Sequence, residues 1–323
     1  MKIAVMGAGG IGAYLGAMLA RNGEDVTLIC RGANLEAIRE NGLRVMYRGE
    51  GYAVANVRAI DRPEDVGPVD VILQCVKLYD LESSSRQMLP MVGPGTMVVP
   101  TQNGVTAHVE IAAVVGPGHV VGGSVFLSSF MVSPGVVERK SPVDVLTFGE
   151  LDGTLSPRVS AFRDVGIAAG YQAVVPENIV SELWKKFVML GGTAALCCLS
   201  RQSVGVICRD ERLCALMVRA MREVEALAQA KGIDVGADVI EKALAFNRAA
   251  KFEARVSMLE DLEAGRRLEL DWTSGYISRE GVRLGVPTPV HDIVYACVSP
   301  YANGSGGRRQ LLPAQGCSQE MNL

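Results

Sequence analysis

Short apolar runs alternate with helix-like stretches through the first half of the chain. KIAVMG at 2–7 and DVTLICR at 25–31 have the composition of strands, and the small and apolar residues at 13–22 between them suit a helix. The alternation continues to about residue 150, with further strand-like runs at 69–77, 96–105, 120–126 and 143–150. Short apolar runs bounded by turns are typical of buried parallel strands. The pattern predicts an α/β fold with a Rossmann-type N-terminal domain.

The pattern changes near residue 176. Three long stretches then carry an apolar residue at every third or fourth position: 177–200, 210–232 and 237–265. This period is that of α-helices. We therefore predict a Rossmann-type domain at 1–172 and a mainly α-helical C-terminal domain at 173–298. The last segment, 299–323, lacks a period and is rich in Gly, Gln and Ser, which predicts a flexible tail.

The turn after the first predicted strand has the spacing G-x-G-x-x-G, in GAGGIG at 7–12. The same opening, with Lys2 before a long apolar run, is also compatible with a secretory signal peptide. A signal peptide ends at a cleavage site and a fresh start, whereas here the strand and helix pattern continues to residue 31. Strand, glycine turn, helix and strand within about 30 residues form a dinucleotide-binding unit. We therefore predict that the segment is retained and binds a dinucleotide.

Each residue type in this turn has a physical reason. Gly7 permits the sharp turn off the strand, Gly9 lets the backbone approach a pyrophosphate, and Gly12 lets the helix pack closely on the sheet. Gly10 and Ile11 belong to the same turn, where the N-terminal N–H groups of the helix point at the anion.

The end of the second predicted strand indicates which dinucleotide binds. An NAD enzyme normally has an acidic residue there for the ribose 2′-hydroxyl, whereas a cation favours the 2′-phosphate of NADP. This strand ends at Arg31, and the first acidic residue after it is Glu36. The alternative is a solvated loop charge, but we predict NADP(H) as the cofactor.

Composition narrows the class of protein. The 32 Lys and Arg against 35 Asp and Glu provide no overall basic field for nucleic acid. With the first segment set aside, no uninterrupted apolar run reaches the ~20 residues of a membrane span. The eight cysteines lack redox or zinc spacings, several lie in apolar runs, and only three histidines are present. We expect a cytoplasmic, metal-free protein without a nucleic-acid or membrane partner.

Polar residues follow two of the predicted strands. Lys77 ends the run at 69–77, and Gln102-Asn103-Gly104 follows the apolar part of the run at 96–105. In an open α/β sheet, ligands bind beyond the carboxyl ends of the strands. We expect these polar residues to line a site.

The motifs together, over residues 1 to about 297, resemble the ketopantoate reductase family (2-dehydropantoate 2-reductases). The matching elements are listed in chain order: GAGGIG at 7–12, Arg31, CVKLYD around Lys77, QNG at 102–104, ENIVSELWKK at 177–186 and SMLEDLEAGRRLELDWTSG at 257–275. The resemblance implies NADPH-dependent reduction of a 2-oxo acid to a 2-hydroxy acid, and a place in pantothenate biosynthesis.

The resemblance also implies roles for single residues. Lys186, the second lysine after Trp184, matches the family lysine that acts as general acid at the ketone oxygen, where negative charge develops. Glu269 matches the acidic residue that orients the substrate hydroxyl. Ser257 matches a serine that binds the substrate carboxylate, Asn103 an asparagine beside nicotinamide and substrate, and Lys77 a lysine that meets cofactor or substrate.

Three positions depart from the family pattern. Leu190 and Ala194 stand where members that reduce ketopantoate commonly carry asparagines, and Ser274 replaces an asparagine near the end of the acidic motif. Loss of hydrogen-bonding groups weakens selection for a hydroxylated substrate. We therefore expect the hydride chemistry to be retained and the preferred 2-oxo acid to be more apolar than ketopantoate.

Two other functions stay open. One is a non-catalytic NADP(H)-binding redox sensor, and the other is a reductase of the same fold acting on a different carbonyl or imine substrate. Retention of both Lys186 and Glu269 argues against a sensor, which needs no paired acid and cation. The aliphatic helices of the second half are compatible with a homodimer interface or with the core of a monomer.

Overall fold

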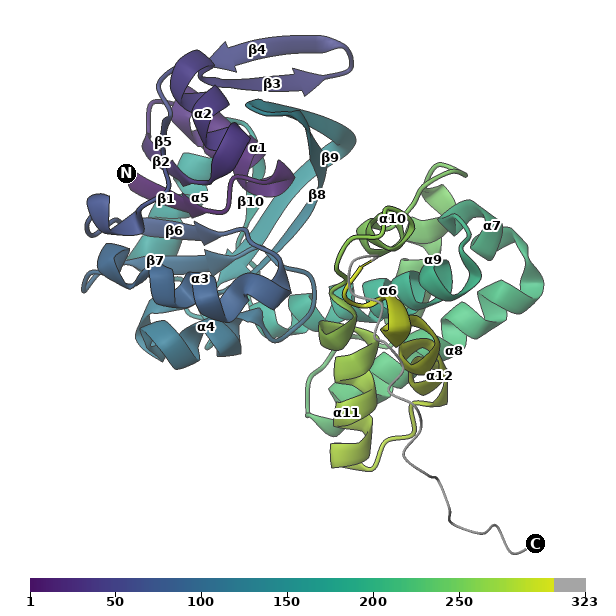
Figure 1. Ribbon diagram of the computed structural model, residues 1–323. Coiled ribbons are helices and arrows are strands. Elements are labelled where there is room, and N and C mark those ends of the chain that lie inside the picture. The colour runs from purple at the N-terminus through teal and green to yellow at the C-terminus, as the bar shows by residue number, and fades with distance from the viewer. Residues whose placement is uncertain (305–323) are drawn as a thin grey trace, which may run out of the picture. The chain divides into compact units, whose positions relative to one another are not determined.

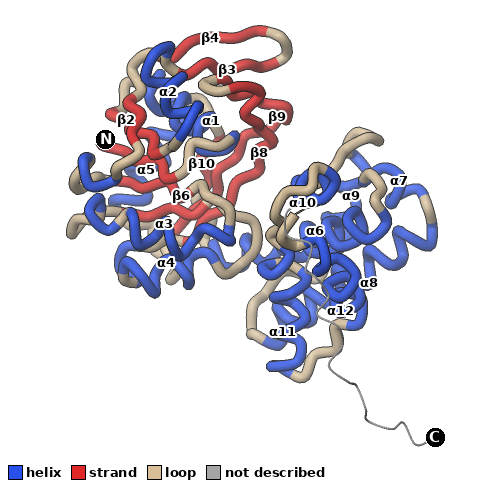
Figure 2. Tube along the Cα trace, viewed as in Figure 1, coloured by secondary structure: helices blue, strands red, loops and turns tan. Residues whose placement is uncertain are grey.

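The computed structural model describes residues 1–304, which belong to two compact units. Unit 1 comprises Met1–Phe187, and unit 2 begins at Val188. Unit 1 combines strands and helices, whereas unit 2 is helical (Figures 1 and 2). The predicted fold class is therefore confirmed.

A five-stranded parallel sheet forms the centre of unit 1, in the order β5-β2-β1-β6-β7. Its strands are β1 (Lys2–Met6), β2 (Asp25–Ile29), β5 (Arg58–Ile60), β6 (Val71–Gln74) and β7 (Met97–Pro100). β6 and β7 are buried along their whole length, which explains their unbroken apolar runs. The strands predicted within 69–77 and 96–105 are confirmed.

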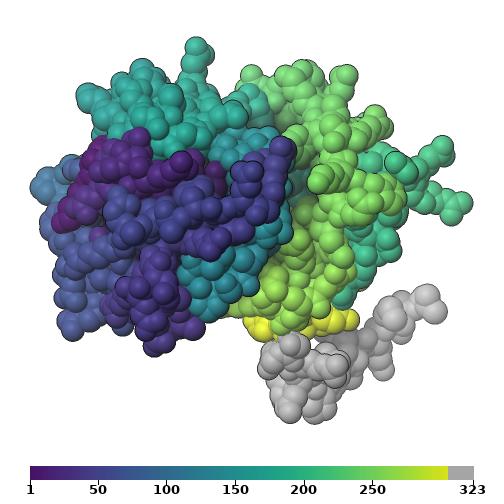
Figure 3. Space-filling view, turned by 90° about the horizontal axis from the view of Figure 1, so that it is seen from above, coloured from purple at the N-terminus to yellow at the C-terminus, as the bar shows by residue number. Residues whose placement is uncertain are grey.

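Helices connect these parallel strands, because a parallel pair needs a long crossover. α1 (Gly10–Arg21) joins β1 to β2, α3 (Leu81–Gln87) precedes β7, and α4 (Ala107–Val115) follows it. Between β2 and β5 the chain forms α2 (Gly32–Asn41) and a hairpin of β3 (Leu43–Tyr47) and β4 (Glu50–Val54), which lies at the surface of unit 1 (Figure 3). Short 3-10 turns complete the connections: η1 (Pro63–Asp65), η2 (Leu78–Asp80), η3 (Leu89–Met91) and η4 (Pro117–His119).

The strands predicted at 120–126 and 143–150 exist, but they do not continue the alternating α/β pattern. β8 (Gly122–Ser133) and β9 (Val136–Gly149) pair antiparallel in a second sheet of order β10-β9-β3-β4, with β8 on β9. The reason is the link between them, which is only Pro134-Gly135 and leaves no room for a crossover.

Helix α1 packs against both sheets of unit 1. A Cβ on Gly16 would lie 2.6 Å from Leu28 of β2, and one on Gly10 would lie 2.0 Å from the carbonyl oxygen of Ser129 in β8. Further along the helix, the Tyr14 hydroxyl donates a 2.6 Å hydrogen bond to the buried Asp144 carboxylate of β9. A helix enclosed in this way has to be apolar all round, which explains its small and apolar composition.

The end of unit 1 differs from the predicted domain boundary at 172/173. After α5 (Pro157–Ala169) and β10 (Gln172–Val174), the long helix α6 (Ile179–Ser200) begins while still packed on unit 1. A Cβ on Gly122 of β8 would lie 2.7 Å from Ile179, so the first turn of α6 rests on this sheet. The packing division therefore falls at Phe187, inside the helix.

Unit 2 is an assembly of helices around the second half of α6. Gly192 allows close approach there, since a Cβ would lie 2.5 Å from Met221 of α8. The other elements are α7 (Val204–Arg209), α8 (Glu211–Ala230), α9 (Val239–Ala249), α10 (Ser257–Glu263), η5 (Leu270–Trp272), α11 (Ser274–Leu284), α12 (Pro289–Val298) and η6 (Ser299–Tyr301).

The single stretch predicted helical at 237–265 is two helices, α9 and α10. Between them, the carbonyls of Phe252 and Ala254 accept hydrogen bonds from the N–H groups of Gly205 and Val204 at the start of α7. These two carbonyls thus accept hydrogen bonds from the first N–H groups of α7, and the segment does not continue the helix α9.

The predicted tail at 299–323 begins differently from the expectation. Ser299–Tyr301 form η6, and the Ala302 carbonyl accepts a 2.8 Å hydrogen bond from the Leu268 N–H. The remainder, 305–323, lies outside the described residues. Within the described part, α6 is long and apolar enough to cross a membrane by length and composition, but 72% of its most apolar window is buried inside the protein.

Candidate active site

The glycine turn at 7–12 is tightly packed at Gly7 and Gly12 and has open space at Gly9. Gly7 has φ of 97°, a conformation that favours glycine, and a Cβ there would lie 2.9 Å from Val76. A Cβ on Gly12 would lie 2.1 Å from the Gly7 carbonyl oxygen, so only glycine lets α1 start so close to the turn. Gly9 is exposed, and a Cβ there would meet nothing within 4 Å.

The N-terminus of α1 lies directly at this open position. Gly9 is the N-cap residue, and within the described chain no side chain caps this helix end. The first N–H groups of a helix carry partial positive charge and bind anions. The open Gly9 and the uncapped helix end together fit the pyrophosphate of a dinucleotide.

Arg31 follows the neighbouring strand β2 and is exposed at the N-cap of α2. One turn later, Asn34 links two loops: its amide donates to the Ala8 carbonyl at 2.9 Å, and its carbonyl oxygen accepts from the Gly135 N–H at 2.9 Å. Asn34 thereby holds the start of α2, and with it Arg31, beside the glycine turn. A guanidinium there fits a 2′-phosphate.

Lys77 and Asn103 follow the two adjacent strands β6 and β7. Gln102, which is buried, donates hydrogen bonds of 2.9 Å to the carbonyls of Gln74 and Val76, and so ties the two strand ends together. Gly104, with φ of 97°, turns the chain away. Lys77 and Asn103 thus stand at the same carboxyl edge of the sheet as the glycine turn, as the sequence predicted.

Lys186, on α6, reaches this edge from another direction. Its ammonium donates hydrogen bonds to Ser124 Oγ at 2.9 Å and to the Val125 carbonyl at 2.7 Å, both in β8. A Cβ on the preceding Gly123 would lie 2.2 Å from the Pro100 carbonyl oxygen, which places this part of β8 at the end of β7. The glycine turn, Arg31, Lys77, Asn103 and Lys186 therefore gather along one edge of unit 1.

The environment of the Lys186 ammonium favours the neutral amine. Burial lowers its pKa from 10.5 to about 7. The Phe126 ring lies 4.8 Å from Nζ and forms part of the enclosure. Two of the three N–H groups of the ammonium have acceptors in the described chain, which leaves one to donate. A lysine with a pKa near neutrality is suited to proton transfer.

Glu269 and Ser257 belong to unit 2. Glu269 precedes η5, and its carbonyl accepts from the Thr273 hydroxyl at 3.3 Å. The same hydroxyl contacts Sδ of Met258 at 3.7 Å, and Met258 follows the exposed Ser257 at the start of α10. The segments that carry Glu269 and Ser257 are thus neighbours within unit 2.

The three positions that depart from the family pattern differ in their surroundings. Leu190 is half-buried on α6 and Ala194 is buried one turn further on. Ser274 is only 1% exposed, and its hydroxyl lies 3.1 Å from Nδ1 of the fully buried His291. Ser274 is therefore satisfied inside unit 2 by a partner 17 residues away, a pairing that the sequence did not indicate.

Models of one family cover most of the chain. "Ketopantoate reductase PanE/ApbA" matches residues 3–153, and "Ketopantoate reductase PanE/ApbA C terminal" matches residues 178–302. A 2-dehydropantoate 2-reductase from Mesorhizobium japonicum is 32% identical, with 98% of this chain and 99% of the relative covered.

Solved structures agree with this match. A PanE/ApbA family ketopantoate reductase from Ralstonia eutropha is 30% identical, has a TM-score of 0.85, and covers 94% of this chain and 98% of its own. A 2-dehydropantoate 2-reductase from Geobacter metallireducens is 28% identical, with a TM-score of 0.86 and coverages of 93% and 99%. A D-mandelate dehydrogenase solved with NADH and anilino(oxo)acetate has a TM-score of 0.84 over 94% and 98% of the two chains, but at 23% identity it shows the fold alone.

Proposed function

Since the chain belongs to the ketopantoate reductase family, whose members are NADPH-dependent oxidoreductases acting on CH–OH groups, we propose that it reduces a 2-oxo acid to the corresponding 2-hydroxy acid. The observation that carries this proposal is Lys186, whose ammonium is enclosed, held by two acceptors and has a pKa lowered to about 7. Such a group at the edge of a dinucleotide-binding sheet serves proton transfer better than ion pairing.

The residues of unit 1 that would hold the cofactor are the glycine turn and Arg31. Gly9 leaves the backbone open to the pyrophosphate, the Gly10 and Ile11 N–H groups lie at the helix end, and the Arg31 guanidinium would bind the 2′-phosphate. NADPH, when bound, supplies the hydride for the ketone carbon. Asn34 holds the start of α2, which carries Arg31, beside the glycine turn.

Lys186 would supply the proton in this reaction. As the carbonyl carbon is reduced, charge builds on the ketone oxygen, and the remaining N–H of the ammonium transfers its proton to that oxygen. The amine that results is stable at neutral pH, because burial disfavours the cation. Ser124 and the Val125 carbonyl fix the direction of Nζ during the transfer.

The other site residues would bind and orient the substrate. Glu269 would accept a hydrogen bond from the substrate hydroxyl, and Ser257 would donate to the carboxylate. Lys77 and Asn103, which stand together at the sheet edge, would contact the cofactor and the carboxylate end of the substrate. A carboxylate paired with cationic and hydroxyl donors is the usual arrangement for binding an acid substrate.

The substrate that we propose is 2-dehydropantoate or a related, more apolar 2-oxo acid. Leu190, half-buried on α6, offers only dispersion contacts where a hydroxyl would need a partner. A pocket surface that lacks a polar group opposite the terminal hydroxyl discriminates weakly between a hydroxylated acid and its apolar analogue. 2-Oxoisovalerate is the matched test compound, because it lacks the terminal hydroxyl.

Turnover of a panel of 2-oxo acids, followed by loss of NADPH absorbance, tests the proposal. Lys186→Ala should lower kcat by about 10²- to 10⁴-fold with NADPH affinity unchanged, the usual range for a lost general acid. Lys185→Ala is the matched control, since that neighbouring lysine pairs with Glu182 at 2.8 Å and should be near wild type. Equal effects of the two substitutions would contradict the assignment, and tight NADPH binding without turnover of any acid would support a redox sensor.

We also propose that the protein is cytoplasmic, because the family consists of soluble enzymes. We propose further that the aliphatic helices of its second half form a homodimer interface, the alternative being that they only fill the core of a monomer. Light scattering of the purified chain at several concentrations tests the dimer.

A further inference from the structure

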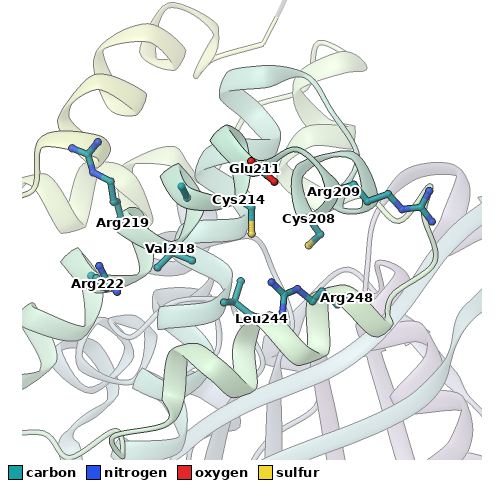
Figure 4. A pocket seen from close by; sticks show the side chains of 10 residues that line it. Cys208, Arg209, Glu211, Cys214, Val218, Arg219, Arg222, Leu244 and Arg248 are labelled. Carbon is teal, nitrogen blue, oxygen red and sulfur yellow. The ribbon is translucent and has the colours of Figure 1, made fainter.

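Residues of helices α7, α8 and α9 of unit 2 line an open groove of about 570 Å³, and none of these residues belongs to the candidate active site (Figure 4). Its floor is apolar and includes Val218, Leu244 and Cys214. Its charged lining residues are four arginines and a single acid: Arg209, Arg219, Arg222, Arg248 and Glu211. Figure 4 shows Arg209 and Arg219 on opposite sides of the groove and Arg248 near its middle.

The spacing on α8 explains why the arginines share one groove. Cys214, Val218 and Arg222 follow each other at intervals of four, and Arg219 lies one position from Val218, so they form one stripe of the helix. The core-facing side of the helix, with Met217, Met221 and Val224, is buried in unit 2. The arginine stripe therefore faces solvent and the neighbouring helix α9.

None of the four groove arginines forms an ion pair within residues 1–304. Other arginines of unit 2 form ion pairs with acidic residues, as in Arg266–Asp261 at 2.7 Å and Arg283–Glu280 at 2.8 Å. Glu211 is the one acid among the described lining residues, and Glu223 lies within electrostatic range of Arg219, so the cations outnumber the acids around the groove. An excess of cations in a concave surface attracts anions.

One of the cations is held by an aromatic ring, and a second lies near a thiol. The Arg209 guanidinium lies 4.4 Å from the centre of the Phe252 ring, which fixes its plane while leaving its donors exposed. Arg248 lies close enough to Cys208 to act on it: burial raises the pKa of that thiol and Cys214 adds to the rise, whereas the Arg248 charge lowers it. Held cations lose less entropy when they bind a ligand.

We propose that this groove binds a small organic polyphosphate, a compound with at least two phosphate groups and an apolar portion. Arginine forks match phosphate oxygens in pairs, and several arginines around one groove require more than one phosphate to neutralise them. The volume lies in the range of small-molecule sites, roughly 300–1,000 Å³. The apolar floor gives a base or another non-polar group a surface to cover.

Titration calorimetry of the full-length protein at low salt tests the site, with inorganic tripolyphosphate and ATP as probes. Arg219→Glu/Arg248→Glu should weaken binding of both probes at least about tenfold, because it reverses two charges in the groove. Arg212→Glu/Lys242→Glu is the matched control: it makes the same charge change on α8 and α9 at exposed residues outside the groove lining, and it should stay within about threefold of wild type. Tighter binding of ATP than of tripolyphosphate would support the apolar portion of the proposed ligand, and the reverse order would contradict it.

Alkylation of Cys214 locates the bound probe. Tripolyphosphate should slow the reaction of Cys214 with iodoacetamide, read by mass spectrometry of its peptide, in wild type and not in Arg219→Glu/Arg248→Glu. Arg219→Ala/Arg248→Ala should give the same loss with less perturbation of charge, and unchanged NADPH affinity verifies that the variants are folded. Equal binding by the two charge-reversal variants, binding without protection of Cys214, or no binding at all would overturn the proposal.

Discussion

Ser124→Ala should lower the pKa of Lys186 and so move the pH dependence of the proposed proton transfer to lower pH. Ser124 Oγ accepts one of the two hydrogen bonds that the Lys186 ammonium donates, at 2.9 Å, and the neutral amine gains much less from this contact. Its removal therefore destabilises the ammonium relative to the amine and lowers the Lys186 pKa further below about 7. A hydrogen bond to a charged group is worth about 1.5–3 kcal/mol. At about 1.36 kcal/mol per pH unit the shift is roughly one to two pH units.

The assay is the pH dependence of kcat/KM in both directions. Reduction needs the ammonium, so its rate falls as the pH rises through the Lys186 pKa, with an inflection near 7 in the wild type and near 6 or below in Ser124→Ala. Oxidation of the 2-hydroxy acid needs the free amine, so its rate falls as the pH drops through the same value.

Ser128→Ala, the same substitution further along β8, is the control and should leave the inflection in place. An unchanged inflection in Ser124→Ala, or a shift toward alkaline pH, would refute the role given to this contact.

Four further substitutions test the cofactor-binding edge of the sheet and the packing that supports it. Arg31→Ala should raise the KM for NADPH about tenfold to a hundredfold and leave that for NADH nearly unchanged, because only NADPH carries the 2′-phosphate; steady-state kinetics with both cofactors decide, and equal losses would exclude the role. Gly9→Ala should weaken NADPH binding without a change in Tm, whereas Gly10→Ala, whose Cβ would lie 2.0 Å from Ser129, should lower the free energy of unfolding by about 1–3 kcal/mol or more; calorimetry and thermal melts separate the two effects. Tyr14→Phe removes a donor to the buried Asp144 and should cost about 1–3 kcal/mol in denaturant unfolding; burial, and then the hydrogen bond to Asp144, raise the Tyr14 pKa. A loss below about 0.5 kcal/mol would show that Arg139, which also donates to Asp144, satisfies the carboxylate alone.

The sequence predicted those elements whose pattern is local. β6 is recognised from nine consecutive letters because it is buried along its whole length. The glycine turn is recognised from six because its spacing is local: Gly7 has a positive φ and Gly12 lies against the Gly7 carbonyl. The second sheet was missed because its order depends on β3 pairing with β9, about 90 positions later along the chain. The packing division at Phe187 has no sequence signal for a similar reason, since the packing of Ile179 on Gly122 leaves no periodic pattern. The domain boundary at 172/173 stays a prediction.

The residues of the candidate site likewise divide into those with a local sequence signal and those without one. Gly9, Lys77 and Asn103 were predicted from their places after strands, and the structure has them at one edge of the sheet. Lys186 carries no local signal among the helix lysines, and its acceptor Ser124 lies 62 positions away. Only the resemblance to the family pointed to Lys186 and Glu269, and only the three-dimensional structure shows Asn34 as the link between the two loops.

Enclosure of α1 by strands that come late in the chain has a consequence for how the protein is made. Tyr14 meets Asp144 across 130 positions, and Ser129 covers Gly10 across a similar span. During synthesis on the ribosome, one side of α1 therefore stays exposed until the hairpin of β8 and β9 has been synthesised. Contacts so distant in sequence slow folding and leave apolar surface exposed in the meantime. The first sixty residues carry the sequence pattern of a complete nucleotide-binding unit, yet their packing is complete only after β8 and β9 have folded against α1.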